Sequence, residues 1–396
     1  MTATSQPDTS APSAQITPFT ANIEQSAIDD LKRRLATTRW IEREPVDDWR
    51  QGVPLSKAEE LVAYWRDSYD WRCFEKRLNT FPQFRTNIDG LGIHFLHVRS
   101  PHEDALPMLI THGWPGSIIE FLDTIDPLVN PTQHGGSAED AFHLVIPSLP
   151  GYGFSDRPTE PGWNHERTAA AWGTLMARLG YTRWVAQGGD WGSLITHAMA
   201  REGVKGLIAA HSNFPLVEPA QLPDHPDPGE QRAIDGLTSF ASGGSAYFAI
   251  HATRPQTIGY GLVDSPVALA TWIYEKFQAW TDNDGDPEDA LTKDQMLDVI
   301  SLYWFTGTGG ASARFYYEAM QALPPGRSIF SFGRIDLPMA GSVFPREVYQ
   351  PPRSWAEESW PNLLYWNEVD EGGHFAAFEQ PALFTTEVRN AFRTMR

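Results

Sequence analysis

Short apolar runs alternate with helix-like stretches through most of the chain. Four of these runs, at residues 107–111, 142–147, 182–187 and 206–211, have the length of buried strands. The stretches between them carry apolar residues three or four positions apart, which indicates helices with one buried side. Strands that alternate with helices favour an α/β fold, in which helices cover both faces of a mostly parallel sheet.

The first 95 residues do not follow this alternation. Residues 1–15 are rich in Thr, Ser, Ala and Pro, and we expect them to form a disordered arm. Residues 16–95 are expected to form a separate N-terminal extension, whose first helix starts at Ser26 because serine is a favoured N-cap. A turn at 89–90 (Asp-Gly) then leads into a strand at 93–98.

A long insertion rich in aromatic residues separates two parts of the predicted sheet. Residues 215–326 are mostly helical in pattern; one helix opens at Ser265, and a Pro-Pro-Gly segment at 324–326 marks the return to the core. We expect this insertion to be a helical lid. The core is then formed by residues 96–214 and 327–396.

Composition and charge restrict the partners of the chain. Its 396 residues are 41% hydrophobic, with 15 Trp and 21 Phe, which is ample for a large buried core. The net charge of −19 disfavours binding to nucleic acid or to anionic membranes, since both require clustered Lys and Arg. Cys73 is the only cysteine, so no intrachain disulfide can form.

The sequence also predicts where the chain is located. The first residues lack the basic segment and apolar core of a cleaved signal. No apolar run approaches the roughly 20 residues that span a bilayer. We therefore expect a cytoplasmic protein that does not insert into membranes, and a homo-oligomer is compatible with the sequence.

The candidate nucleophile lies where a strand meets a helix. Residues 188–192 (Gly-Gly-Asp-Trp-Gly) follow the run 182–187 and precede a stretch with helical spacing. Small residues on each side let the backbone double back, as in the nucleophile elbow of α/β-hydrolases, whose centre is normally serine. Asp190 stands there instead. The alternative is that Asp190 only caps the helix.

An aspartate at this turn changes the chemistry that the site can perform. A carboxylate that attacks carbon in a shaped, dry site gives an ester intermediate. Its attack on a carboxylic ester would give a less stable mixed anhydride, so the electrophile should be an sp3 carbon. Asp190 therefore predicts the opening of a strained ring or the displacement of a halide.

A second turn is expected to stabilise an oxyanion. The run 107–111 continues into residues 112–116 (His-Gly-Trp-Pro-Gly), the position from which such folds donate a backbone N–H to the oxyanion hole. The expected donors are the N–H groups of Trp114 and Trp191. For His112, a structural role beneath the turn is favoured over proton transfer.

A histidine and a carboxylate follow two later strands. The strand-like stretch 362–369 ends in a glycine-rich turn with His374, the only one of the 12 histidines so placed and the candidate general base. Asp336 precedes and Glu347 follows the strand-like stretch 338–344. Because ligands gather beyond the carboxyl ends of such strands, Glu347 is the preferred acid that orients the imidazole. The alternative for His374 and for Glu347 is an exposed loop position.

Tyrosines of the insertion are candidates for a further task. Opening of a strained ether ring requires groups that support negative charge on its oxygen, and phenolic O–H groups can do so at neutral pH. Tyr247 and Tyr316 are the expected donors. The alternative is that both only pack within the lid, as aromatic residues commonly do.

Together these motifs resemble the microsomal and juvenile-hormone epoxide hydrolase branch of the α/β-hydrolase superfamily. The resemblance extends from about Ile16 to the end of the chain. It includes the segments 16–40, 64–72, 78–91, 112–117, 150–155, 187–193, 264–266, 275–277, 303–308 and 372–378. One feature departs from the family, because mammalian members begin with a membrane-spanning helix and this chain has no such segment.

The resemblance implies a reaction and the residues that perform it. An epoxide would be opened to a vicinal diol through a hydroxyalkyl ester of the enzyme, which a histidine-activated water then hydrolyses. The family's nucleophile, base, acid and two lid donors fall on Asp190, His374, Glu347, Tyr316 and Tyr247. Tyr317, next to Tyr316, is the alternative for that donor. No metal or organic cofactor is implied, and the partners are the epoxide and water.

Two other functions stay open from the sequence. A haloalkane dehalogenase shares the fold and the aspartate, and would use the indoles of Trp114 and Trp191 to hold a halide. A catalytically silent ligand receptor would have lost a catalytic residue, and none is missing.

The aromatic lid favours a bulky, apolar or aryl epoxide from detoxification or from secondary (antibiotic) metabolism. The natural substrate and the stereochemical outcome are not determined by the sequence.

Overall fold

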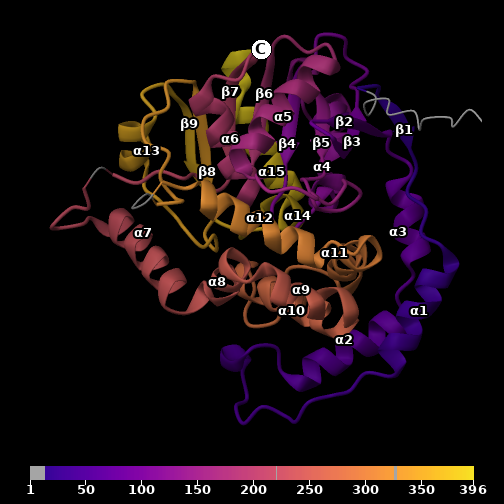
Figure 1. The fold of residues 1–396 in the computed structure, drawn as a ribbon. Coiled ribbons are helices and arrows are strands. Elements are labelled where there is room, and N and C mark those ends of the chain that lie inside the picture. The colour runs from indigo at the N-terminus through magenta and orange to yellow at the C-terminus, as the bar shows by residue number, and fades with distance from the viewer. Residues whose placement is uncertain (1–13, 220, 325–327) are drawn as a thin grey trace, which may run out of the picture.

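The sheet forms the centre of the molecule. The computed structural model describes residues 14–219, 221–324 and 328–396. The predicted arm before residue 14 and most of the Pro-Pro-Gly segment at 324–326 lie outside the described residues. Nine strands form one sheet in the order β1-β2-β3-β5-β4-β6-β7-β8-β9 (Figure 1). The strands are β1 (Thr17–Phe19), β2 (Gln83–Ile88), β3 (Leu91–Val98), β4 (Leu106–Thr111), β5 (Phe142–Pro147), β6 (Trp184–Gly188), β7 (Leu207–Ser212), β8 (Met339–Val343) and β9 (Leu363–Glu368).

The direction of the strands divides the sheet into two parts. From β5 to β9 all neighbouring strands are parallel. At the other end, β1, β2 and β3 pair antiparallel, and β3 joins β5 in the same way. This is the mostly parallel α/β sheet expected from the sequence, and the prediction of the fold class is confirmed.

Helices cover both faces of the parallel part. Helix α5 packs against α6, while α4 packs against α15 on the opposite face (Figure 1). Every residue of β5 and β6 is buried, because strands covered on both faces have no solvent side, which explains their continuous apolar sequence. The helices of the core are α4 (Leu122–Val129), α5 (His165–Arg178), α6 (Asp190–Glu202), α13 (Arg353–Ser359), α14 (Ala376–Glu379) and α15 (Pro381–Ala391).

The insertion is a layer of helices below the sheet in Figure 1. Its helix α12 packs against α8 and α9, and α10 packs against α9 and α11. Helix α10 begins after Ser265, which caps it as the sequence predicts, with Ser265 Oγ accepting the Ala268 N–H at 3.2 Å. The helices of this layer are α7 (Pro228–Ser239), α8 (Ala246–Thr253), α9 (Pro255–Asp264), α10 (Pro266–Trp280), α11 (Lys293–Thr306) and α12 (Gly309–Ala322).

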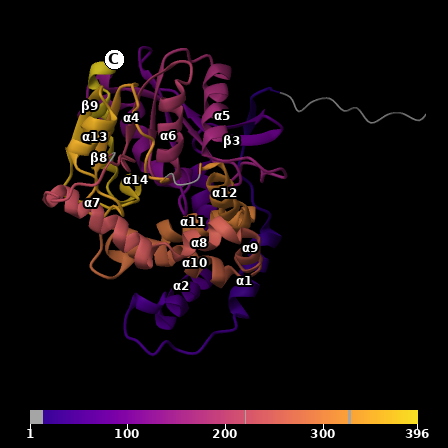
Figure 2. The same cartoon turned by 60° about the vertical axis from the view of Figure 1, so that its left-hand side comes forward.

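The N-terminal extension wraps around the side of the lid that faces away from the sheet, as Figures 1 and 2 both show. Its helices are α1 (Gln25–Ala36), α2 (Leu55–Asp67) and α3 (Trp71–Leu78). Trp65 Nε1 of α2 donates to Ser301 Oγ of α11 at 2.9 Å. The exact limits of extension, core and lid, at residues 95, 214 and 326, stay a prediction.

The predicted start of the first helix is wrong. Helix α1 begins at Gln25 after Glu24, and Ser26 lies inside it without capping a backbone N–H. The chain that enters this helix is held by α3 instead, because the Ile23 N–H donates to Glu75 Oε1 at 2.7 Å. A contact between distant segments therefore replaces the local serine cap.

None of the helices in the described ranges combines the length and the apolar character that crossing a bilayer requires.

Candidate active site

Asp190 occupies a turn that only a glycine-rich sequence can form. It is the first residue of α6 and has a positive φ of 49°, a conformation that costs a non-glycine residue roughly 1 kcal/mol or more. A Cβ at Gly192 would lie 1.9 Å from Thr111 O, and one at Gly188 would lie 2.1 Å from Gly192 O. Gly189, not Asp190, is the N-cap residue of α6. The turn therefore presents the carboxylate at the end of β6 instead of using it as a cap.

One oxygen of Asp190 is hydrogen-bonded to the backbone and the other contacts His374. The Trp114 N–H donates to Asp190 Oδ1 at 2.8 Å. The Trp191 N–H belongs to the first turn of α6, where N–H groups have no acceptor within the helix. The Trp114 N–H is thus beside the Asp190 carboxyl group, and the role of the Trp191 N–H stays a prediction. Asp190 Oδ2 lies 3.4 Å from His374 Nε2.

His374 and Glu347 meet at the ends of two neighbouring strands. Glu347 follows β8 and His374 follows β9, and a parallel bridge between Arg346 and Gly373 joins their loops. His374 Nδ1 lies 2.7 Å from Glu347 Oε1. The two residues are 8% and 3% exposed, so neither is the exposed loop residue that was the alternative. The imidazole thus lies between two carboxylates.

The two carboxylates decide the charge of His374. Burial alone would lower the pKa of its imidazole, but the negative charge of Glu347, followed by the contact with Asp190, raises that pKa well above its usual value. His374 is therefore protonated at neutral pH. It can accept a proton only after one of these charges is removed.

Both predicted lid tyrosines line the pocket that contains Asp190 and His374. Tyr247 is on α8 and Tyr316 on α12, with ring centroids 5.9 Å apart. Burial, supplemented by nearby charge on Asp190, raises the pKa of both phenols well above the usual value, so both keep their protons. Tyr317, the neighbouring alternative, is 37% exposed and does not line this pocket.

The hydroxyl of Tyr316 is buried and has no hydrogen-bond partner among the described residues. A buried hydroxyl without a hydrogen-bond partner costs free energy. We therefore expect a bound ligand to supply the partner of this hydroxyl. The pocket around it is walled mainly by apolar side chains. Its lining is formed by Asp190, Trp191, Leu194, Phe214, Phe240, Tyr247, Phe248, Trp280, Tyr316, Ile329, Phe330, Val348 and His374.

His112 is a structural residue beneath the turn, in agreement with the expectation from the sequence. Its Nε2 accepts the Leu149 N–H at 3.1 Å, so its proton is on Nδ1, which donates to Gly113 O at 2.9 Å. Burial lowers the pKa of its imidazole to about 4. A neutral ring with both nitrogens engaged cannot transfer protons to the site.

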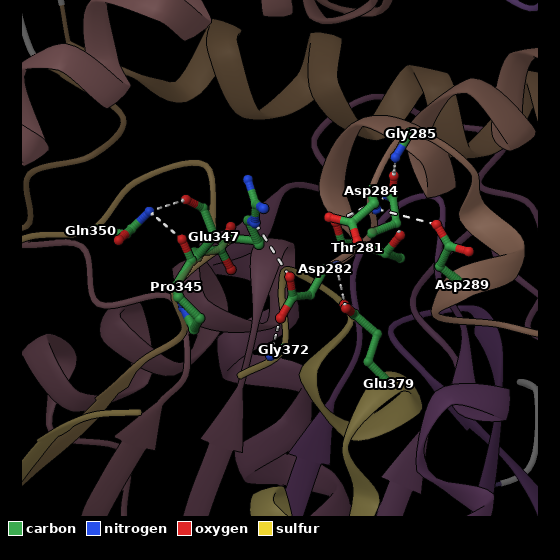
Figure 3. A network of polar contacts seen from close by, with 12 residues as sticks. Thr281, Asp282, Asp284, Gly285, Asp289, Pro345, Glu347, Gln350, Gly372 and Glu379 are labelled. Atoms are coloured by element: carbon green, nitrogen blue, oxygen red, sulfur yellow. Dashed lines mark hydrogen bonds and ion pairs between the residues drawn. The ribbon is translucent and has the colours of Figure 1, made fainter. Parts of the chain in front are cut away.

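A polar network that the sequence did not predict supports the His374 loop (Figure 3). Asp282, just after α10 of the lid, accepts the Gly372 N–H on Oδ2 at 2.9 Å and contacts Arg346 Nε through Oδ1 at 3.3 Å. The Asp282 N–H in turn donates to Glu379 Oε2 at 2.7 Å. The His374 N–H donates to Trp280 O at 2.9 Å, so the end of the lid helix fixes the backbone of the base.

No sequence signal distinguished Asp282 or Glu379 from the many exposed carboxylates of the chain, because their role depends on contacts between distant segments. Among the described residues, no group of three or more His, Cys, Asp or Glu is arranged to hold a metal ion.

Comparison with known proteins gives consistent matches along the chain. The model of the family described as epoxide hydrolase N terminus matches residues 16–121, and that of the alpha/beta hydrolase fold matches residues 107–246. The chain is 60% identical over 382 residues to a Stigmatella aurantiaca protein named "Putative epoxide hydrolase", covering 96% of this chain and 86% of that protein. It is 36% identical over 412 residues to epoxide hydrolase 1 of Sus scrofa, covering 94% and 88% of the two chains.

A solved structure extends the similarity to three dimensions. The juvenile hormone epoxide hydrolase of the silkworm Bombyx mori is 31% identical, with a TM-score of 0.87 over 97% of this chain and 96% of that one.

Proposed function

This chain belongs to the epoxide hydrolase family of the α/β-hydrolase fold, and on that premise we propose that it hydrolyses its epoxide through a covalent ester on Asp190. One observation carries the proposal. Asp190 Oδ1 is held by a backbone N–H at 2.8 Å, while Oδ2 has a longer contact with His374 Nε2 at 3.4 Å, at a pocket that contains two buried tyrosines. This arrangement suits a carboxylate that attacks carbon with one oxygen.

The first step forms the ester. Asp190 Oδ2 attacks a ring carbon of the epoxide, and the bond between that carbon and the ring oxygen breaks. The O–H groups of Tyr247 and Tyr316 donate hydrogen bonds to the oxygen as negative charge develops on it. One of them supplies the proton that converts the alkoxide to the first hydroxyl. The raised pKa of both phenols keeps them in the donating form at neutral pH.

Formation of the ester prepares His374 for the second step. The ester of Asp190 is neutral, so one of the two negative charges that raise the pKa of His374 disappears. The imidazole can then lose its proton, which returns to the tyrosine that protonated the alkoxide, and act as a base while Glu347 holds its Nδ1. The charge of the nucleophile thus determines when the base becomes available.

The second step breaks the ester. His374 Nε2 takes a proton from water as the water oxygen bonds to Cγ of Asp190. Oδ1 becomes an oxyanion, which the N–H groups of Trp114 and Trp191 stabilise. The bond between Cγ and the oxygen of the alkyl group then breaks, and that oxygen receives the proton from His374. The product is a vicinal diol. The second proton of the water then passes from the Asp190 carboxyl group to His374, so that Asp190 is a carboxylate and His374 an imidazolium again.

The walls of the pocket indicate the substrate class. Its polar side-chain groups are those of Asp190, His374, Tyr247, Tyr316 and the indoles of Trp191 and Trp280, and the remaining walls are apolar. Apart from the reacting groups Asp190 and His374, the described lining residues offer no counter-ion to a charged substituent. We therefore expect an epoxide with a bulky apolar or aryl body.

A single turnover in ¹⁸O-labelled water tests the covalent route. With enzyme in excess over an aryl epoxide such as styrene oxide, the first diol should contain no heavy oxygen, because its second hydroxyl comes from Asp190. The label should appear in the Asp190 carboxylate. Heavy oxygen in the first diol would show that water attacks the ring directly. Asp190→Ala is the control and should form no diol above the uncatalysed rate.

A further inference from the structure

A second, smaller cavity adjoins Asp190 and His374. It offers about 20 Å³ to the centre of a water molecule, which slightly exceeds the roughly 10–15 Å³ that one water requires. Among the described residues, Asp190 and His374 are the two that line both this cavity and the substrate pocket. The two spaces therefore meet at the nucleophile and the base.

The two spaces differ in chemistry. The substrate pocket has mostly apolar walls, whereas the small cavity brings together the carboxyl group of Glu120, the amide of Asn213 and the backbone around Gly113. A buried water needs two to four polar partners, and these groups together with His374 provide them. The small cavity thus suits water and excludes the apolar body of a substrate.

Glu120 is held so that one oxygen is free. It lies on the 3-10 turn Ile118–Phe121, where its Oε1 accepts the Ser117 N–H at 3.0 Å in a capping box. Among the described residues, its Oε2 has no hydrogen-bond partner. A Cβ at Gly116 would lie 1.3 Å from Oε1, so a glycine is required for the carboxyl group to fit beneath the turn.

The surroundings of Glu120 are those of a buried acid close to the reacting groups. Burial raises the pKa of its carboxyl to about 8, the charge of His374 lowers it, and the charge of Asp190 raises it. The carboxyl group of Glu120 is thus coupled to the charges of both reacting groups.

We propose that the small cavity binds the hydrolytic water and that Glu120 positions it. One O–H of this water points to His374 Nε2 and the other to Glu120 Oε2, which leaves a lone pair directed at Cγ of Asp190. When the oxygen bonds to Cγ, the first proton moves to His374 and then to the departing alkyl oxygen. Glu120 exchanges no proton. The inference rests on the covalent route proposed above.

The variant Glu120→Gln separates this role from packing. Its amide oxygen can still accept the Ser117 N–H, but its NH₂ group then occupies the place of Oε2 and cannot accept a hydrogen bond from water. We expect ester hydrolysis to slow by about 10- to 100-fold, the cost of a misplaced reactant, while formation of the ester keeps its parent rate. In steady state kcat and KM then fall together and kcat/KM is unchanged.

The measurement is rapid mixing with styrene oxide, an acid quench and the intact mass of the protein. In the parent the alkylated form should appear and decay, and in Glu120→Gln it should accumulate. Glu139→Gln is the matched control, because it makes the same change at an exposed carboxyl group on another 3-10 turn, Ala138–Asp140. Its ester should decay at the parent rate.

Ala377→Val provides a second variant, since Ala377 lines the cavity from α14 and a larger side chain would displace the water. This variant should also slow the decay of the ester while the ester still forms at the parent rate. Decay at the parent rate in both variants would overturn the proposal, as would an equal loss of both steps. Absence of any ester in the parent would instead refute the covalent route.

Discussion

The hydroxyl groups above Asp190 are expected to act on the first step. Tyr316→Phe removes one donor to the developing alkoxide, and the rate of ester formation should fall by about 100-fold, as for other single oxyanion donors. Tyr247→Phe should act in the same direction. Tyr317→Phe is the matched control, because its side chain is 37% exposed. Single-turnover quench measurements decide the question, and an unchanged rate in Tyr316→Phe would remove that residue from the mechanism.

The charge of Asp190 is expected to control His374. The side chain in Asp190→Asn is neutral, like the ester, but does not react with the epoxide. The variant therefore lacks one of the two negative charges that raise the pKa of His374. Nuclear magnetic resonance of the imidazole during a pH titration should show a lower pKa in Asp190→Asn than in the parent protein. An unchanged pKa would mean that Glu347 alone sets it and that alkylation does not activate the base.

The turn between β6 and α6 depends on glycines that approach other backbone closely. Gly192→Ala would bring a methyl group to 1.9 Å from Thr111 O, an atom that cannot move without disturbing β4. We expect a loss of about 1–3 kcal/mol or more in the free energy of unfolding, as for overpacked cores. Gly261→Ala in α9 is the control, because nothing lies within 4 Å of the added Cβ; it should stabilise by up to about 1 kcal/mol. Denaturant unfolding measures both.

The elements that the sequence predicted well are those whose signal is local. The core strands were located to within two residues, since buried parallel strands are continuous apolar runs. Strand β2 was not predicted, because Gln83–Ile88 alternates polar and apolar residues near the edge of the sheet. The start of α1 was misplaced because Glu75 of another helix holds the preceding residue.

The same distinction applies to the site. Asp190 and His374 lie at glycine-rich turns that are visible in the sequence, and Glu347 was preferred because it follows a predicted strand. The two tyrosines were chosen from the lid, where packing was the more common role, and the family resemblance then supported all three assignments. The buried carboxyls of Glu120 and Glu379 were not singled out. Burial of a carboxyl depends on what folds against it, and a single sequence does not contain that information.

The assembled molecule holds its lid between the sheet and the N-terminal extension (Figures 1 and 2). Solvent-accessible ion pairs at this contact, such as the half-buried pair of Lys57 with Asp286 at 2.6 Å, contribute on the order of 0–1 kcal/mol each. Hydrogen bonds between less exposed groups contribute more to stability. Tyr69 Oη of the extension donates to Asp298 Oδ1 of α11 at 2.7 Å. This bond ties the extension to the lid helix that ends at Thr306.

Asp298 should make this contact sensitive to pH. Burial raises the pKa of its carboxyl to about 7, well above the value of 3.8 expected in an unfolded chain. The folded protein thus binds the proton more tightly, so this contribution to stability is complete below about pH 4 and is lost as the pH rises through 7. Asp298→Asn can still accept the Tyr69 bond but cannot ionise. Between pH 5 and 8, its free energy of unfolding should decline less than that of the parent, by about 1 kcal/mol or more.

Asp294→Asn is the matched control for this prediction, because Asp294 precedes Asp298 by one turn of α11 and accepts a bond from Tyr64 Oη at 2.9 Å, but is exposed. Its effect on the pH dependence should be much smaller, since water already solvates the charge. Urea unfolding of the three proteins at each pH compares them directly. Equal pH slopes for parent and Asp298→Asn would show that the buried carboxyl does not ionise in this range, and that the lid contact does not depend on its charge.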